Sequence, residues 1–259
     1  MRTNRLRSLL KVGEVALGTA ILEVKGRGVF QALGAAGMDF AWICSEHTAF
    51  SLETVADMVA DAHAAGLTPI VRIPDLRYEH VTRLLDIGCQ SLIVPHIRTG
   101  AEVRQLIAFA KYHPAGNRGI AIYGGANVNY DNVDTTTATT HANANTLLAL
   151  IIETGEALEN LEDILLPEID LVLIGHQDLS HDLGLPGQYD HPKVRQAEAK
   201  IRESCKRNQI ALGQILNRPE DIAEAVASGS QFLLYSVDIM LIKREARRAT
   251  DALRLVRKH

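Results

Sequence analysis

Two carboxylic acids follow apolar runs at separate points of the chain. Glu153 ends the segment LLALIIE, and Asp178 comes shortly after the segment LVLI. Two carboxylates that meet repel each other unless a proton or a cation lies between them. Carboxylate oxygens with open positions for water suit Mg²⁺ or Mn²⁺. Glu153 and Asp178 are therefore candidate metal ligands, with a salt bridge at either residue, or a helix cap at Asp178, as the alternatives.

One arginine and three histidines occupy comparable positions. Arg72 lies inside PIVRIP, where its guanidinium needs an anion, and its planar fork suits a carboxylate or a developing enolate. His47 comes shortly after the run FAWIC and titrates near neutral pH, which makes it a candidate for proton transfer. For His96 and His176, hydrogen-bonded structural roles are favoured over metal ligation.

These side chains can meet only if the apolar runs before them are strands of one sheet. Eight short runs rich in β-branched residues recur, and nearly continuous apolar character is typical of parallel strands covered on both faces. We expect strands at residues 17–22, 40–44, 69–73, 91–94, 148–152, 171–174, 212–216 and 232–237. Helical patterns alternate with them at residues 52–65, 79–86, 101–112 and 219–227.

The alternation predicts the fold. Eight strand–helix repeats in a chain of 259 residues favour a closed (β/α)8 TIM barrel that forms a single α/β domain over residues 1–259. The alternative is an open doubly wound sheet, but no strand-to-helix turn carries a GxGxxG motif. In a barrel the carboxyl ends of the strands share one face. We therefore expect a common site for the polar residues that follow the strands: Glu46, His47, Arg72, His96, Glu153, Asp178 and Asp238.

One connection is too long for a simple loop. It runs from residue 96 to residue 147 and contains one helical pattern followed by a polar stretch with TTTATTH. Long connections within a compact domain are usually functional. A lid or a subunit contact is therefore favoured over a plain surface excursion.

The totals exclude several classes of protein. A net charge of −4 argues against a nucleic-acid or anionic-membrane partner, and no apolar run reaches the roughly 20 residues of a membrane span. Three cysteines without a CxxC pair indicate reduced thiols and a cytoplasmic location. Among them, Cys44 is expected to be a buried, inert apolar side chain.

Several of these stretches resemble the HpcH/HpaI family of class II (metal-dependent) pyruvate aldolases, and the resemblance runs nearly end to end. The order and spacing of the EH, VR, IET and DLS elements are those of the family, and together they are specific. The matching segments include LGTAIL, AAGMDFAWICSEHTAFSLETV, PIVRIPD, LLDIGCQSLIVP, YHPAGNRG, IIETGEALENLEDI and LVLIGHQDLSHDLGLPGQYDHPKV.

The resemblance implies roles for four of the residues above. Glu153 and Asp178 would bind a divalent metal, which would be Mg²⁺, Mn²⁺ or Co²⁺. Arg72 would hold the pyruvate oxygen and steady the enolate, and His47 would take part in proton transfer.

The resemblance also implies a carboxylate site and an assembly. The backbone after Gly175, at the start of a helix, would receive the substrate carboxylate, so Gly175, His176, Gln177 and Asp178 are substrate-binding candidates. Family members are typically hexamers whose C-terminal helices exchange between subunits. A homo-oligomer, hexamer or trimer, is therefore implied here, with residues 238–257 as the swapped helix.

The sequence departs from the family pattern near the expected site. Cys44 stands where the family usually has an Asp that pairs with the histidine of the EH dipeptide. His96 stands where Met is common, Ala144 where Asp is common, and the family's GPAD reads GHQD at residues 175–178. The metal and enolate positions are retained, whereas the surroundings of proton transfer and the aldehyde side are changed.

The implied reaction is cleavage or formation of the C3–C4 bond of a 4-hydroxy-2-oxo acid, which gives pyruvate or a close 2-oxo acid and an aldehyde. The C4 hydroxyl must lose its proton to a base, for which a metal-bound water relayed to His47 is the candidate. No lysine lies at a predicted strand end, which disfavours a Schiff-base mechanism. The alternatives are an acyl-CoA lyase resembling the citrate lyase beta subunit, a barrel lyase acting on phosphoenolpyruvate-like substrates, and a non-catalytic binding barrel.

Overall fold

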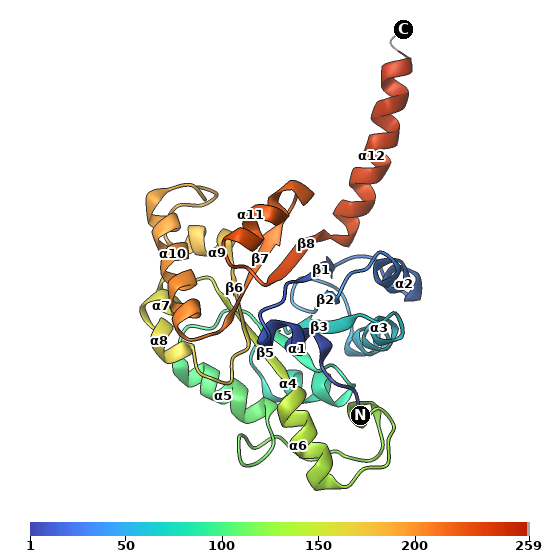
Figure 1. Ribbon diagram of the computed structural model, residues 1–259, viewed down its shortest axis with the longest axis vertical. Coiled ribbons are helices and arrows are strands. Elements are labelled where there is room, and N and C mark those ends of the chain that lie inside the picture. The colour runs from blue at the N-terminus through green and yellow to red at the C-terminus, as the bar shows by residue number, and fades with distance from the viewer. Residues whose placement is uncertain (258–259) are drawn as a thin grey trace.

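Eight parallel strands close into a barrel in the computed structural model, which describes residues 1–257 (Figure 1). Neighbouring strands pair in sequence order, and β8 returns to pair with β1. The predicted (β/α)8 TIM barrel is confirmed, and each strand lies within one residue of its predicted ends. The strands are β1 (Ala16–Ile21), β2 (Phe40–Cys44), β3 (Thr68–Arg72), β4 (Ser91–Val94), β5 (Leu147–Ile152), β6 (Leu171–Ile174), β7 (Ala211–Leu216) and β8 (Phe232–Val237).

Helices surround the barrel and connect its strands (Figure 1). Those between β1 and β5 are α2 (Arg27–Ala35), α3 (Leu52–Ala64), α4 (Tyr78–Asp86), α5 (Gly100–Ala110), the short 3₁₀ turn η1 (Ala126–Val128) and α6 (Thr135–Asn145). Those after β5 are α7 (Gly155–Glu159), α8 (Leu161–Ile164), α9 (His176–Asp182), α10 (Pro192–Arg207), η2 (Pro219–Asp221), α11 (Ile222–Ala227) and α12 (Asp238–Val256). α1 (Arg5–Lys11) precedes β1.

Apolar side chains fill both sides of the sheet, as the continuous apolar strands predict. One cluster lies between the strands and the surrounding helices, and a second lies inside the barrel. Inside the barrel the rings of Phe40 and Phe232 stack with their centroids 4.0 Å apart. A Cβ on Gly18 would lie 2.4 Å from the carbonyl oxygen of Phe40, so a glycine is needed there. The interior is therefore a packed core, and ligands can enter only at its ends.

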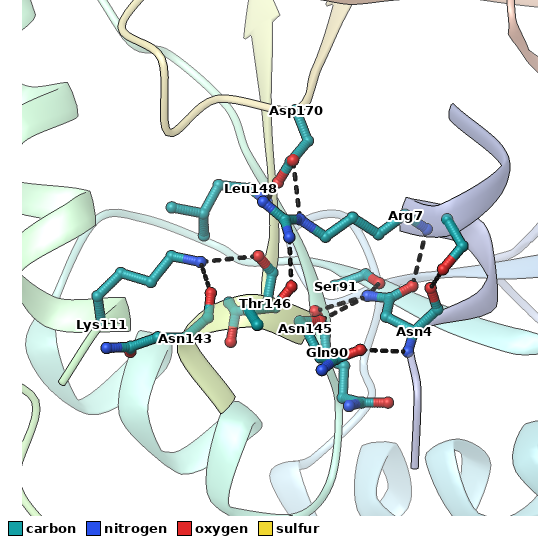
Figure 2. A network of polar contacts seen from close by, with 12 residues as sticks. Asn4, Arg7, Gln90, Ser91, Lys111, Asn143, Asn145, Thr146, Leu148 and Asp170 are labelled. Atoms are coloured by element: carbon teal, nitrogen blue, oxygen red, sulfur yellow. Dashed lines mark hydrogen bonds and ion pairs between the residues drawn. The ribbon is translucent and has the colours of Figure 1, made fainter. Parts of the chain in front are cut away.

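A polar network closes the amino-terminal end of the barrel (Figure 2). Asn4 donates to Ser91 Oγ over 2.9 Å, and Arg7 donates through Nε to Asp170 Oδ1 over 2.8 Å. Lys111 is buried and donates to the carbonyl oxygens of Asn143 and Thr146. Burial lowers the pKa of Lys111 to about 8. Side chains that are engaged with one another thus close this end of the barrel.

The second half of the long connection, residues 96–147, belongs to that closed end. Asp134 caps α6 by accepting a hydrogen bond from Thr137 N, and Asn145 Oδ1 at the end of α6 accepts one from Asn4 N over 3.0 Å. The N-terminus lies beside α6 (Figure 1). α6 therefore lies at the end of the barrel opposite Glu153 and cannot act as a lid there.

α12 projects away from the barrel (Figure 1). Of its residues only Asp238 is buried. Asp238 Oδ2 accepts hydrogen bonds from the backbone N–H groups of Leu22, Glu23 and Val24 over 3.1, 2.9 and 2.7 Å. Asp238 therefore ties the start of α12 to the loop after β1. No helix among residues 1–257 is long and apolar enough to cross a lipid bilayer.

Candidate active site

The carboxyl ends of β2 to β6 bring most of the expected polar residues together. In the sheet Cys44 pairs with Arg72, and Arg72 pairs with Ile93, so the ends of β2, β3 and β4 are level. Glu46 and His96 follow the ends of β2 and β4. Glu153 follows β5, and Asp178 lies in the first turn of α9 after β6. Parallel register therefore produces one polar face from segments far apart in the sequence.

Glu153 is the most enclosed carboxylate of this face. Its side chain is 3% exposed, and its Oε1 accepts a hydrogen bond from His96 N over 2.6 Å. A Cβ placed on Gly175 would lie 2.7 Å from Glu153 Oε2. Burial raises the pKa of Glu153 above its ordinary value; His96 acts against this shift, and the carboxylates of Asp178 and Glu46 add to it. Bound positive charge would relieve this accumulation of carboxylates.

Asp178 is exposed at the barrel mouth and makes no ion pair in the described part of the chain. Its influence on the pKa of Glu153 shows that the two carboxylates are near enough to interact. Within residues 1–257 no group of three or more His, Cys, Asp or Glu side chains is arranged to hold a metal ion. The expected metal ligands, Glu153 and Asp178, are thus a pair of carboxylates that would leave other coordination positions to water or substrate.

Arg72 is held on three sides. Its Nη2 donates to Cys44 Sγ over 3.2 Å, and its Nε lies 3.0 Å from Glu46 Oε2. The Nε–Oε2 contact is an ion pair without hydrogen-bond geometry. The guanidinium carbon lies 5.6 Å from the centroid of the Trp42 ring. Cys44 and Glu46 therefore restrain the guanidinium, and its remaining N–H groups are available to a ligand.

His96 links the two halves of the site. Its Nε2 lies 2.8 Å from Glu46 Oε1 and its Nδ1 lies 2.9 Å from Glu153 Oε1. Its φ of 58° is in the left-handed region, which non-glycine residues rarely adopt. This backbone conformation turns both the N–H and the ring of His96 toward Glu153. The strain is located where the site is assembled, as is common at functional sites.

Three of the expected residues have contacts that bear directly on their expected roles. The His47 side chain is 60% exposed, and its Nε2 lies 3.7 Å from Glu46 Oε1, which is too long for a hydrogen bond. The His176 ring contacts Glu198 of α10 over 3.1 Å, so any contribution of this residue to a ligand site would come from its backbone. Asp238 was expected at the common site, but its Oδ2 instead accepts hydrogen bonds from three backbone amides of the loop after β1.

The sequence placed Glu46 at the common site without a specific role, favoured a hydrogen-bonded structural role for His96, and predicted an inert Cys44. Glu46 contacts Arg72 and His96, and Cys44 accepts hydrogen bonds from Arg72 and from His47 N. Cys44 is buried as expected, but its sulfur has polar partners. The place of Glu46 after a predicted strand and the EH dipeptide were the signals for this residue, whereas the contacts of His96 depend on its backbone conformation.

Comparison with known proteins places the chain among close structural relatives. The model of the HpcH/HpaI aldolase/citrate lyase family matches residues 31–244. The hydroxypyruvate/pyruvate aldolase of Roseobacter denitrificans is 27% identical over 240 residues, which cover 92% of this chain and 93% of that protein. The 2-keto-3-deoxy-L-rhamnonate aldolase of Escherichia coli is 28% identical over 241 residues, 92% and 89% of the two chains. The crystal structure of an HpcH/HpaI aldolase from Desulfitobacterium hafniense superposes with a TM-score of 0.90 at 29% identity and covers 96% of each chain.

Proposed function

This chain belongs to the HpcH/HpaI aldolase/citrate lyase family and is a carbon–carbon lyase; from that premise we propose that it is a metal-dependent pyruvate aldolase. The substrate is a 4-hydroxy-2-oxo acid, and the products of C3–C4 cleavage are pyruvate, or a close 2-oxo acid, and an aldehyde. The observation that carries the proposal is the buried Glu153, crowded by the carboxylates of Asp178 and Glu46 and linked through His96 and Glu46 to the restrained guanidinium of Arg72.

Glu153 and Asp178 would hold the metal. Glu153 Oε1 is fixed by His96 N, so the Oε2 atom beside Gly175 is the oxygen free to bind a cation. A hard divalent cation such as Mg²⁺, Mn²⁺ or Co²⁺ would supply Lewis-acid stabilisation of the charge that develops on the substrate keto oxygen. The burial that raises the pKa of Glu153 makes the carboxylate a better ligand than an isolated surface acid.

Arg72 supplies the second positive group. Its Nε and Nη2 are held by Glu46 and Cys44, and its remaining N–H groups would donate to the oxygen of a bound 2-oxo acid. A donor that is oriented before the reaction stabilises the enolate without reorganisation when the bond breaks. Removal of one such donor typically costs about 10²–10³-fold in kcat.

The start of α9 is the candidate site for the substrate carboxylate. The first hydrogen bond of this turn runs from Leu179 N to Gly175 O over 2.8 Å, so the amides of His176, Gln177 and Asp178 precede it. Free amides of this kind bind anions. His47 remains the candidate for proton transfer, because its exposed side chain can move toward the aldehyde part of a substrate.

The exposed apolar face of α12 supports a homo-oligomer in which this helix packs on a neighbouring subunit, as a hexamer or a trimer. The face consists of residues spaced by three or four: Ile239, Ile242, Ala246, Ala249, Leu253 and Val256. Such a stripe on a helix normally packs against another surface. Light scattering should give the mass of a hexamer or trimer, and Leu253→Asp should reduce the mass whereas Arg248→Ala, off the stripe, should not. A monomeric wild type would contradict this assembly.

We propose in addition that residues 1–259 form one domain and that the protein acts in the cytoplasm. A single closed barrel accounts for every described strand. All three cysteines are free and buried, which agrees with a reducing compartment.

The test is pyruvate release from a panel of 4-hydroxy-2-oxo acids after treatment with EDTA and after addition of Mg²⁺, Mn²⁺ or Co²⁺. Release that depends on the metal and is lost in Glu153→Gln and in Asp178→Asn is the expected result. The control is Glu203→Gln, an exposed carboxylate of α10, which should leave release unchanged. Tight metal binding without release from any acid would favour an acyl-CoA or phosphoenolpyruvate lyase, and absence of metal binding would refute the site.

A further inference from the structure

Cys44 is the side chain that faces Arg72 across the β2–β3 pair. The two residues are direct partners in the register of these strands. The sulfur accepts one hydrogen bond from Arg72 Nη2 over 3.2 Å and a second from His47 N over 3.4 Å. Cys44 is 1% exposed, so water does not replace either contact. The sulfur is thus an acceptor held between a cation and a backbone amide.

The other two cysteines have different surroundings. Cys89 Sγ donates to the carbonyl oxygen of Ser91 over 3.1 Å, and burial raises its pKa to about 12. Burial raises the pKa of Cys205 to about 12 as well. These two behave as buried thiols packed among apolar side chains. Among the three cysteines, Cys44 alone accepts hydrogen bonds from two N–H donors, and a guanidinium cannot accept a hydrogen bond in return.

The contact matters because it acts on the orientation of Arg72. Glu46 engages Nε with its Oε2, and Cys44 engages Nη2, so the plane of the guanidinium is fixed from two sides. The Trp42 ring lies against the same group. Without the sulfur acceptor, the Arg72 guanidinium would lose one of the two contacts that fix its plane and could rotate about its outer bonds. A loosely held donor stabilises a developing charge less well.

We propose that Cys44 is a positioning residue that sets the orientation of Arg72 through the Nη2–Sγ hydrogen bond. The proposal rests on the proposed function, in which Arg72 binds the 2-oxo acid. Cys44 itself does not touch the substrate. Its role is therefore that of a hydrogen-bond acceptor rather than of an apolar packing group. It acts on the enolate side of the reaction rather than on the aldehyde side.

The variants that test this are Cys44→Ala, which removes the acceptor, and Cys44→Ser, which retains one. Cys205→Ala is the matched control, because this buried cysteine lies on α10 away from the site. We expect Cys44→Ala to lower kcat about 10-fold, the scale of one hydrogen bond to a charged group, while Cys44→Ser recovers most of the loss. Cys205→Ala should change kcat less than about 2-fold, on the scale of a change remote from the reacting atoms.

A double-mutant cycle distinguishes positioning from a loss of packing. In an Arg72→Lys background, Cys44→Ala should cause no further loss of kcat, because the group that it positions is absent. The same coupling should be seen in the binding of oxalate, a planar dicarboxylate with the shape of an enolate, measured by calorimetry with Mn²⁺ present. Additive losses in the two variants would overturn the proposal, as would equal oxalate affinity in wild type and Cys44→Ala.

The two proposals fail in different ways. A wild type that binds oxalate with Cys44-dependent affinity but releases no pyruvate from any acid would defeat only the proposed function. A wild type that releases pyruvate while Cys44→Ala keeps the same kcat and oxalate affinity would defeat only the positioning role. Absence of oxalate binding in the wild type would overturn the positioning role, since Arg72 would then not face an anion.

Discussion

Replacement of Gly175 by alanine tests whether the space beside Glu153 is essential. The backbone of Gly175, at φ −81° and ψ 77°, is accessible to alanine. The added Cβ would, however, lie 2.7 Å from both Cβ and Oε2 of Glu153 and 3.0 Å from Cγ2 of Ile151. Comfortable contacts between such atoms are about 3.5 Å or longer, so Glu153 would have to move by several tenths of an ångström or more.

Glu153 has little freedom to make that movement. Its side chain is 3% exposed, and the 2.6 Å bond from His96 N fixes Oε1. Overpacking of this kind costs about 1–3 kcal/mol, which corresponds to a fall of a few degrees in the thermal midpoint. Displacement of a metal ligand on this scale should lower kcat/KM about 100-fold. Mn²⁺ affinity should fall about 10- to 100-fold.

The assays are calorimetric titration of Mn²⁺ and the rate of pyruvate release. Gly28→Ala is the matched control, because a Cβ at Gly28 in α2 would meet no atom within 4 Å. This variant should keep wild-type metal affinity and activity. If Gly175→Ala binds Mn²⁺ as tightly as the wild type and releases pyruvate at the same rate, Glu153 Oε2 is not a metal ligand in this orientation.

Three further predictions concern other parts of the molecule. Because burial lowers the pKa of Lys111 to about 8, from 10.5, the unfolded state holds a proton between these values that the folded state has released. Stability relative to Lys111→Met should therefore rise with pH from about 8 to 10, by at most about 1.4 kcal/mol per pH unit; a constant difference in unfolding free energy would contradict this. Asp238→Ala leaves the three amides of residues 22–24 without their acceptor. It should lower the free energy of unfolding by about 3 kcal/mol in denaturant titrations. An unchanged denaturation midpoint would show that these hydrogen bonds do not stabilise the fold. His96→Gly tolerates the positive φ but removes the ring between Glu46 and Glu153; it should lower kcat about 10-fold without lowering the thermal midpoint, and full activity would exclude a role of the ring.

The strands were predictable because burial on both faces requires a nearly continuous run of apolar residues. The run at residues 40–44, for example, is apolar throughout, and it forms β2 with every residue buried. α6 has no such pattern, since its threonines and asparagines form no apolar stripe and only Ala138 is buried. Its start is determined by the Asp134 cap and its end by a contact with the N-terminal segment, neither of which has a periodic pattern.

Strand ends predicted which residues meet, but not which way their side chains face. Arg72 and Glu153 reach the same face because parallel register requires it. His96 joins that face through a left-handed backbone conformation, which cannot be predicted from its residue type. Asp238 stands at an equivalent strand end, yet the neighbouring backbone amides bind both of its oxygens. Local hydrogen-bonding competition of this kind is visible only once the loops are in place.

Closure of the barrel has a consequence for how the protein is made. β1 pairs with β8, so the register partner of Ala16 is Phe232, more than 200 residues later in the chain. During synthesis on a ribosome, β1 therefore waits with an unpaired edge until nearly the whole chain has emerged. Unpaired parallel edges and exposed apolar faces invite association with other nascent chains. The hydrogen bonds between Asp238 and the loop after β1 form only once β8 has been synthesised. A chain that ends before Asp238 would leave the barrel open and accessible to chaperones and proteases.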